Sequence, residues 1–121
     1  MSDKSIYALR SDIFKALAHP LRIEVIDILQ EGELCFSQVL EKTGGLKSNL
    51  SQHLTIMVGN GILKMRKDSR CNYYSLASPK VAKACLLMRE VLTENVKRRN
   101  AAPSNITPNN AQPIFFILLK F

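Results

Sequence analysis

Hydrophobic residues recur every three or four positions through the first sixty residues, which is the spacing of one face of an α-helix. The pattern predicts four helices, over about residues 5–18, 20–31, 36–43 and 46–59. Pro20 suits the first turn of the second helix, with His19 at the cap position before it. Gly44 and Gly45 end the third helix. The first half of the chain is therefore predicted to be helical.

The periodicity changes after Gly61. Two short runs, residues 62–66 and 71–76, flank the charged turn 67–70 and predict a two-stranded β-hairpin. Pro79 opens a last helix, whose apolar stripe is wider than a lone surface helix needs. Beyond residue 100 the chain is rich in Asn, Pro and Ala, and it ends on the apolar run PIFFILLKF.

This order of elements predicts a mainly helical fold with a small β-hairpin, α-α-α-α-β-β-α. Two short helices joined by a glycine-bearing turn and followed by a hairpin are the layout of a winged helix-turn-helix. We expect one domain over residues 1–98, which binds DNA and dimerises, and a flexible linker with a short apolar tail over residues 99–121.

The charge is uneven along the chain. The whole sequence carries +7, but residues 1–61 hold six basic and seven acidic side chains, a net −1. Residues 62–121 hold eleven basic and three acidic side chains, a net +8. A local excess of this size favours a polyanion as partner, with nucleic acid ahead of an anionic membrane, although a soluble surface also carries charge.

The fourth helix and the hairpin supply the residues expected to contact DNA. One face of the helix is small and polar, and no acid occurs from Leu46 to Lys67. Such side chains hydrogen-bond base edges and phosphates, while the hairpin cations neutralise phosphates. One of the two adjacent tyrosines of the hairpin is expected to pack inward and the other to face DNA. The predicted DNA-binding residues are Lys47, Ser48, Asn49, Ser51, Gln52, Thr55, Lys64, Arg66, Lys67, Arg70 and Tyr73.

Several blocks of the sequence resemble the ArsR/SmtB family of winged-helix repressors. They are ALAHPLRIEVIDIL, GELCFSQVLEKTG, SNLSQHLTIM, GNGIL and KMRKDSRCNYYSL, in the family's order, within residues 9–95. The resemblance implies a homodimeric transcriptional repressor that binds a palindromic double-stranded DNA operator and is released by a metal ion, a metalloid or an oxidant in many members. It places the recognition helix over Ser48 to His53. The residues before that helix depart from the family pattern. Family members commonly have a single glycine, then an apolar residue and then a polar cap, whereas this chain has Gly44-Gly45-Leu46.

The apolar stripes of the first and last helices are expected to form a two-fold interface between identical subunits. The residues predicted to contribute to dimerisation are Ile6, Leu9, Ile13, Val81, Cys85, Met88 and Leu92.

The three cysteines bear on what the protein senses. In the metal-sensing relatives, the resemblance implies two thiolates in the pattern E-L-C-x-C, and here Ser37 stands at the second position after Cys35. Serine is a poor ligand for soft metals, so we predict neither a metal site nor a cofactor, and Cys35 remains the one candidate ligand. Cys71 lies between Arg70 and Asn72, where a cationic neighbour favours the thiolate. His53 is expected to pack against the core.

No nucleophile, phosphate loop or zinc motif points to catalysis, so an enzyme is not expected. Two alternatives to the DNA-binding repressor remain: a winged-helix module that binds only proteins, and a thiol or metal sensor that uses Cys35. A membrane-associated regulator is a further alternative, but the tail is short, and no stable membrane association is expected. Polar residues where a signal peptide would be apolar predict a cytoplasmic protein.

Overall fold

The helices at the start of the chain begin and end where local side chains satisfy the backbone. The computed structural model describes residues 5–101. Helix α1 (Ile6–Leu17) begins after Ser5, whose hydroxyl accepts the amide of Ala8 at 3.2 Å. Helix α2 (Pro20–Ile28) begins after His19, whose Nδ1 accepts the amide of Leu21 at 3.1 Å. The predicted cap role of His19 is confirmed.

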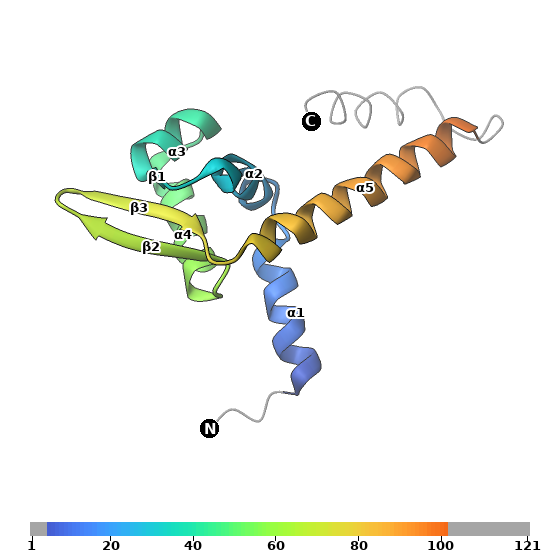
Figure 1. Cartoon of the computed structure of the whole chain (residues 1–121), viewed down its shortest axis with the longest axis horizontal. Coiled ribbons are helices and arrows are strands. Elements are labelled where there is room, and N and C mark those ends of the chain that lie inside the picture. The colour runs from blue at the N-terminus through green and yellow to red at the C-terminus, as the bar shows by residue number, and fades with distance from the viewer. Residues whose placement is uncertain (1–4, 102–121) are drawn as a thin grey trace. The chain divides into compact units, whose positions relative to one another are not determined.

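The next elements form the helix-turn-helix. A 3₁₀ turn (Leu29–Glu31) leads into strand β1 (Leu34–Cys35), helix α3 (Phe36–Thr43) and helix α4 (Lys47–Gly59). Gly44 caps α3 at φ 66°, a left-handed conformation that strains any residue with a Cβ. Its amide donates to the carbonyl of Leu40 at 2.9 Å. This tight turn sends the chain directly from α3 into α4 (Figure 1).

The sheet has three strands, so the predicted two-stranded hairpin is incomplete. Strands β2 (Leu63–Asp68) and β3 (Cys71–Leu76) form the hairpin, and β1 adds to the other edge of β3, which gives the order β1-β3-β2 with antiparallel pairing throughout. The turn is also shorter than predicted, because pairing continues to Asp68 and Cys71, and Ser69 adopts φ 56°. Strand β1 was not predicted, because two residues are too few to show the alternation of apolar and polar side chains that indicates a strand.

The core lies among α2, α3, α4 and the base of the hairpin. Helix α4 buries the predicted row of apolar side chains, Leu50, Leu54 and Met57, completely. Helix α2 packs against both α3 and α4. Apolar contacts of this kind hold α4 in a fixed orientation on the domain. The residues that are at most 3% exposed are Ala16, Val25, Ile26, Leu29, Val39, Leu50, Leu54, Met57, Ile62 and Leu63.

The chain divides into two compact units. The first ends at Lys83 and contains every element up to β3 with the start of α5 (Pro79–Ala101), while the second begins at Ala84 and contains the rest of that helix. Helix α5 continues to Ala101, three residues past the predicted domain boundary at residue 98. The remainder of the predicted linker and apolar tail lies outside the described residues. Within residues 5–101, no helix combines the length and apolar character needed to cross a membrane.

Candidate nucleic-acid interface

Helix α4 presents a continuous polar surface opposite its buried stripe. Six residues of this surface are exposed, all of them predicted to contact DNA, and α4 contains no acidic residue. The hydroxyl of Thr55 donates to the carbonyl of Ser51 at 2.9 Å, so its oxygen remains as an acceptor. The arrangement offers donors and acceptors without a charge that would repel phosphates. The six residues are Lys47, Ser48, Asn49, Ser51, Gln52 and Thr55.

The start of α4 is electropositive. Leu46 occupies its cap position and makes no side-chain hydrogen bond to the first turn. Amides at a helix start have no partners within the helix, and they carry the positive end of the helix dipole. Lys47 adds a full charge at the same place. The first turn of α4 therefore attracts anions.

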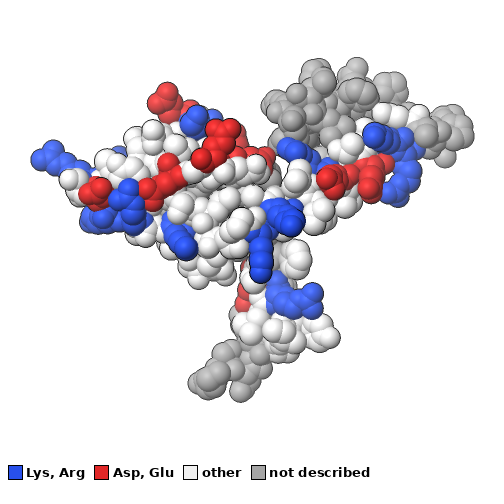
Figure 2. Space-filling view, in the orientation of Figure 1, with Lys and Arg blue, Asp and Glu red and all other residues white. Residues whose placement is uncertain are grey.

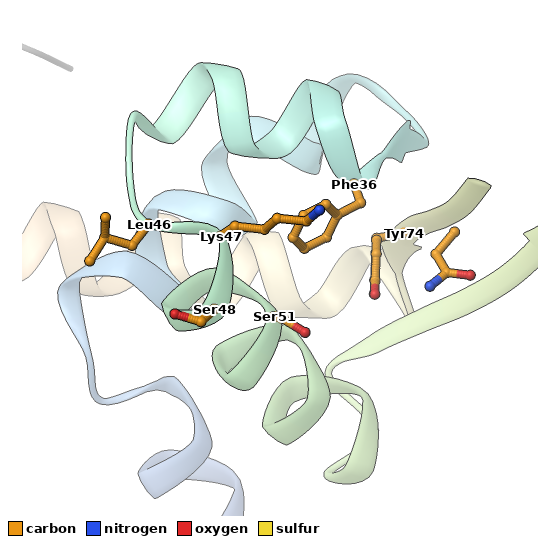
Figure 3. Close-up of a pocket in the computed structure, with 7 residues that line it drawn as sticks. Phe36, Leu46, Lys47, Ser48, Ser51 and Tyr74 are labelled. Atoms are coloured by element: carbon orange, nitrogen blue, oxygen red, sulfur yellow. The ribbon is translucent and has the colours of Figure 1, made fainter. Parts of the chain in front are cut away.

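An open hollow of about 660 Å³ lies beside this first turn. Figure 3 shows the side chain of Lys47 extending toward Phe36, and Ser51 and Tyr74 also line the hollow. The hollow thus joins the start of the predicted recognition helix to β3 of the hairpin, and its walls are both polar and aromatic. The lining residues are Phe36, Leu46, Lys47, Ser48, Ser51, Asn72 and Tyr74.

The two faces of the hairpin carry different side chains. In the antiparallel register Arg66 lies opposite Tyr73, and Lys67 lies opposite Asn72. Residues opposite one another share a face, and neighbours along a strand alternate. The register therefore places Arg66 and Tyr73 together on one face of the hairpin, while Lys67 and Asn72 share the other.

Arg66 already has partners within the protein. Its Nη2 lies 2.7 Å from Oε1 of Glu33, its Nε donates to both oxygens of that carboxylate at 3.0 Å, and its Nη1 lies 3.3 Å from Asp68. The guanidinium also stacks 4.5 Å above the ring of Tyr73. These hydrogen bonds, to Glu33 first and then to Asp68, raise the pKa of Arg66.

The hairpin consequently carries acids among its cations, as Figure 2 shows by red side chains beside blue ones. Lys64, Lys67 and Arg70 are exposed, and among residues 5–101 the ion pairs of the hairpin are those of Arg66 with Glu33 and Asp68. The other three cations are therefore better placed than Arg66 to meet phosphates.

Tyr74 is the inward tyrosine of the pair. It is 8% exposed, whereas Tyr73 is half-buried beneath Arg66. Burial raises the pKa of Tyr74, and a side-chain hydrogen bond with Asn72 opposes that effect. The expectation that one ring packs inward is confirmed, and a DNA contact by Tyr73 stays a prediction.

A histidine–arginine cluster supports α4 from the core side. His53 is 9% exposed, and its Nδ1 accepts a hydrogen bond of 3.0 Å from Nε of Arg22. The ring of His19 lies 4.1 Å away, centroid to centroid. Burial first, then the charges of His19 and Arg22, lower the pKa of His53. The predicted packing role of His53 is confirmed, but Arg22 was not identified from the sequence, because its partner lies 31 positions away.

The residues at the start of α3 do not fit a metal ion. Sγ of Cys35 lies 3.2 Å from Oγ of Ser37, and hydrogen bonds from Ser37 and from the Gln38 backbone lower the pKa of this thiol. One thiol with a serine neighbour is half of a soft-metal site. Within residues 5–101, no three His, Cys, Asp or Glu side chains are grouped to hold a metal. Cys71 is exposed and lies opposite Asp68 in the hairpin.

The residues predicted for dimerisation lie on both units. In the first unit Ile6 is 63% exposed, and Leu9 and Ile13 are each 48% exposed. In the second unit Met88 is 61% exposed, and Leu86, Leu87 and Val91 extend the same apolar character. The remaining three predicted residues, Val81, Cys85 and Leu92, are partly buried. Each unit therefore has apolar side chains in contact with solvent.

Comparison with known proteins places the chain in a family. Residues 19–64 match the family model described as bacterial regulatory protein, arsR family. The relative named as the uncharacterised HTH-type transcriptional regulator Rv0081 of Mycobacterium tuberculosis H37Rv is 34% identical over 102 residues, which are 84% of this chain and 90% of the relative. The crystal structure of Rv0081 superposes with a TM-score of 0.74 and 33% identity, covering 82% of this chain and 100% of that one.

A third relative is the arsenical resistance operon repressor of Staphylococcus xylosus. It is 36% identical over 70 residues, which are 58% of this chain and 67% of the relative. The matched residues 19–64 contain the helix-turn-helix and reach into β2. This chain therefore belongs to the bacterial ArsR family and has its winged helix-turn-helix fold.

Proposed function

We propose that the protein is a DNA-binding transcriptional repressor that acts in the cytoplasm as a homodimer on a palindromic operator. The observation that carries the proposal is the exposed surface of α4, where six polar residues lie together with no acid among them. Family membership and the names of the relatives support it. The proposed role requires no catalytic chemistry.

The parts of the interface have different tasks in this proposal. Ser48 and Gln52 on α4 contact base edges in the major groove, and Lys47 approaches a phosphate beside the hollow. Lys64, Lys67 and Arg70 on the hairpin contact phosphates, which strengthens binding to every sequence. A module that binds only proteins has no use for these exposed cations, which favours DNA as the partner.

The residues around Cys35 do not match those needed to bind an arsenical. The name of the Staphylococcus xylosus relative refers to arsenical resistance, but Cys35 has a serine where a second thiol would be needed. The lowered pKa of Cys35 favours its thiolate, the form that is oxidised or alkylated, while the lack of a second thiol disfavours a soft metal. We propose that any signal read at this position acts through covalent thiol chemistry.

Footprinting on genomic DNA fragments tests the function, followed by binding measurements on the protected site over a range of salt concentrations. Gln52→Ala is expected to lose about 1–3 kcal/mol of discrimination between the operator and unrelated DNA, because a base contact is removed. The double variant Lys67→Ala, Arg70→Ala is expected to bind all sequences more weakly. Its salt slope should fall by about 0.9 for each phosphate that is no longer neutralised.

Lys80→Ala is the matched control, since it removes an exposed cation from the start of α5 and leaves α4 and the hairpin intact. It should bind like the parent. A parent protein that protects no fragment, or hairpin variants that keep the full salt slope, would contradict the proposal.

A further inference from the structure

Leu46 is exposed, and its side chain neither packs in the core nor caps a helix. It is 74% exposed, so its side chain adds little to the core. It occupies the cap position of α4, where a side-chain oxygen would normally bond the free amides of the first turn. Leucine has no such oxygen. The residue is therefore better explained by something outside the protein that its side chain contacts.

The backbone holds this side chain at the entrance to the recognition helix. The carbonyl of Leu46 accepts the amide of Leu50 at 2.9 Å, and Leu50 is fully buried. Leu46 also forms one end of the hollow beside the first turn, and Figure 3 shows Leu46 and Ser48 on the same side of it, away from Tyr74. The position of Leu46 relative to Ser48 is thus fixed by the core.

The surroundings of Leu46 select a polyanion as its partner. Lys47 follows it directly, the helix start is electropositive, and no acid lies between Leu46 and Asp68 in the sequence. Of the groups that DNA presents in the major groove, the thymine C5-methyl is the apolar one. Residues at the start of a recognition helix are those that reach base edges.

We propose that Leu46 contacts the methyl group of a thymine in each operator half-site and so contributes to sequence specificity. This inference rests on the proposed DNA-binding function and adds one base preference to it. Ser48 and Gln52 read hydrogen-bonding groups, whereas Leu46 reads an apolar one. Removing one methyl group from such a contact weakens binding about fourfold, the equivalent of ~0.8 kcal/mol.

The test replaces thymine by uracil, which lacks only the C5-methyl group. Each thymine of the footprinted operator is replaced in turn, and affinities are measured for the parent and for Leu46→Ala. The affinity of the parent should fall about fourfold at one thymine per half-site. Leu46→Ala should bind the thymine and uracil operators equally, with about the affinity that the parent has for an operator carrying uracil at that position in both half-sites, because both subunits of the variant lack the contact.

Ile23→Ala is the matched control, because Ile23 is an aliphatic residue, 41% exposed, on α2. It should keep the parent's sensitivity to uracil. Thermal unfolding and sedimentation of Leu46→Ala without DNA should match those of the parent, since the side chain is outside the core.

The outcomes separate this inference from the function on which it rests. If the parent binds its operator but Leu46→Ala keeps the same uracil sensitivity, Leu46 does not read thymine, and DNA binding stands. If Leu46→Ala changes the association state without DNA, the side chain covers a protein surface and the inference is wrong. If the parent binds no DNA fragment, both proposals fail.

Discussion

Cys35 shows how a single neighbouring side chain sets the chemistry of a thiol. The hydrogen bond with Ser37 is the largest cause of its lowered pKa, and the Gln38 backbone adds to it. Because the thiolate is the reactive form, a lowered pKa increases reactivity at neutral pH. The serine that replaces a second thiol thus activates the remaining one.

We therefore expect Cys35 to react with iodoacetamide at a lower pH than a free thiol. Ser37→Ala removes the largest stabilising contact, so the pH midpoint of alkylation should rise and the rate at pH 7 should fall. Peptide mass spectrometry gives the rate for each cysteine separately, and Cys71, which lies outside this hydrogen-bonded group, serves as the internal reference. Equal Cys35 rates in the parent and in Ser37→Ala would contradict this reasoning.

His53 predicts how stability depends on pH. Its pKa is lowered in the folded protein, so the unfolded chain takes up the proton first as the pH falls. The contribution of neutral His53 is fully present above its ordinary pKa, near 6.5, and is lost as the pH falls below that value. Urea unfolding at a series of pH values should show this loss, with a slope of at most about 1.4 kcal/mol per pH unit for one proton.

His53→Gln tests the assignment, because a glutamine oxygen can accept from Arg22 without titrating. This variant should show a weaker dependence on pH between 7 and 5. His19→Asn is the control: asparagine also caps a helix, and burial of His53, the main cause of its shift, is left in place. A pH dependence that survives in His53→Gln would assign the effect to another group.

At the scale of elements, Arg22 joins three helices. It lies on α2, donates to His53 on α4, and its Nη1 reaches the carbonyls of Lys15 and Ala16 at 3.2 and 3.4 Å. These carbonyls belong to the last turn of α1, and that of Lys15 also accepts the amide of the cap residue Ala18 at 3.2 Å. One guanidinium therefore satisfies a helix end and a buried ring together.

Arg22→Ala should lower the free energy of unfolding by about 1.5–3 kcal/mol, the range for hydrogen bonds to charged groups. Chemical denaturation measures the change. Arg10→Ala removes an exposed arginine from α1 and should stay within about 0.5 kcal/mol of the parent. Equal losses in the two variants would show that the contacts of Arg22 are not what stabilises the protein.

The ion pair between Glu33 and Arg66 connects the hairpin to the segment before α3. Both side chains are partly exposed, 33% for Glu33 and 53% for Arg66, so the pair contributes little to stability. Its larger effect is on the charge available to DNA. Glu33→Gln removes the closer of the two carboxylates paired with Arg66 and leaves Asp68, so it should raise the affinity for unrelated DNA and steepen the salt slope by up to about 0.9 per subunit.

Glu31→Gln makes the same change in net charge in the 3₁₀ turn and leaves the contacts of Arg66 as they are. Fluorescence anisotropy with a random duplex at several salt concentrations compares the two variants. If both change the slope equally, net charge is the cause, and the pairing of Arg66 is not.

The sequence predicted the elements whose signals are local. The inward stripe of α4 and the cap at His19 follow from residues within one or two helical turns, and both predictions are confirmed. Strand β1 was missed because two residues show no period. Glu33, the closer partner of Arg66, lies 33 positions away, and Arg22, the partner of His53, lies 31 positions away, so no local pattern records these two contacts. From the sequence alone Arg66 is therefore indistinguishable from an unpaired cation, although in the folded protein it forms an ion pair with Glu33.

For the whole molecule, the exposed apolar residues predict self-association. Met88→Glu places a charge on a side chain that is 61% exposed in the single chain. In the proposed dimer this charge would be buried without a partner, so the variant should be monomeric at concentrations on the order of tens of micromolar. It should also lose operator affinity, because the dimer holds two recognition helices about 34 Å apart.

Light scattering coupled to size exclusion measures the mass. Lys83→Glu introduces the same side chain at an exposed position of α5, and it should leave the mass unchanged. A parent protein that is monomeric at these concentrations would contradict the proposed dimer.

The pairing of Arg66 also bears on how the protein finds its operator in a cell. A chromosome offers millions of unrelated sites, and these compete for the protein mainly through phosphate contacts. An arginine already held by Glu33 attracts such sites less, while the base contacts of α4 are unaffected. Fewer copies are then held on unrelated DNA, and each non-specific encounter ends sooner. Because the operator presents the same phosphates, its affinity falls in the same proportion, so the pairing shortens the time spent on unrelated DNA and leaves the ratio of the two affinities unchanged.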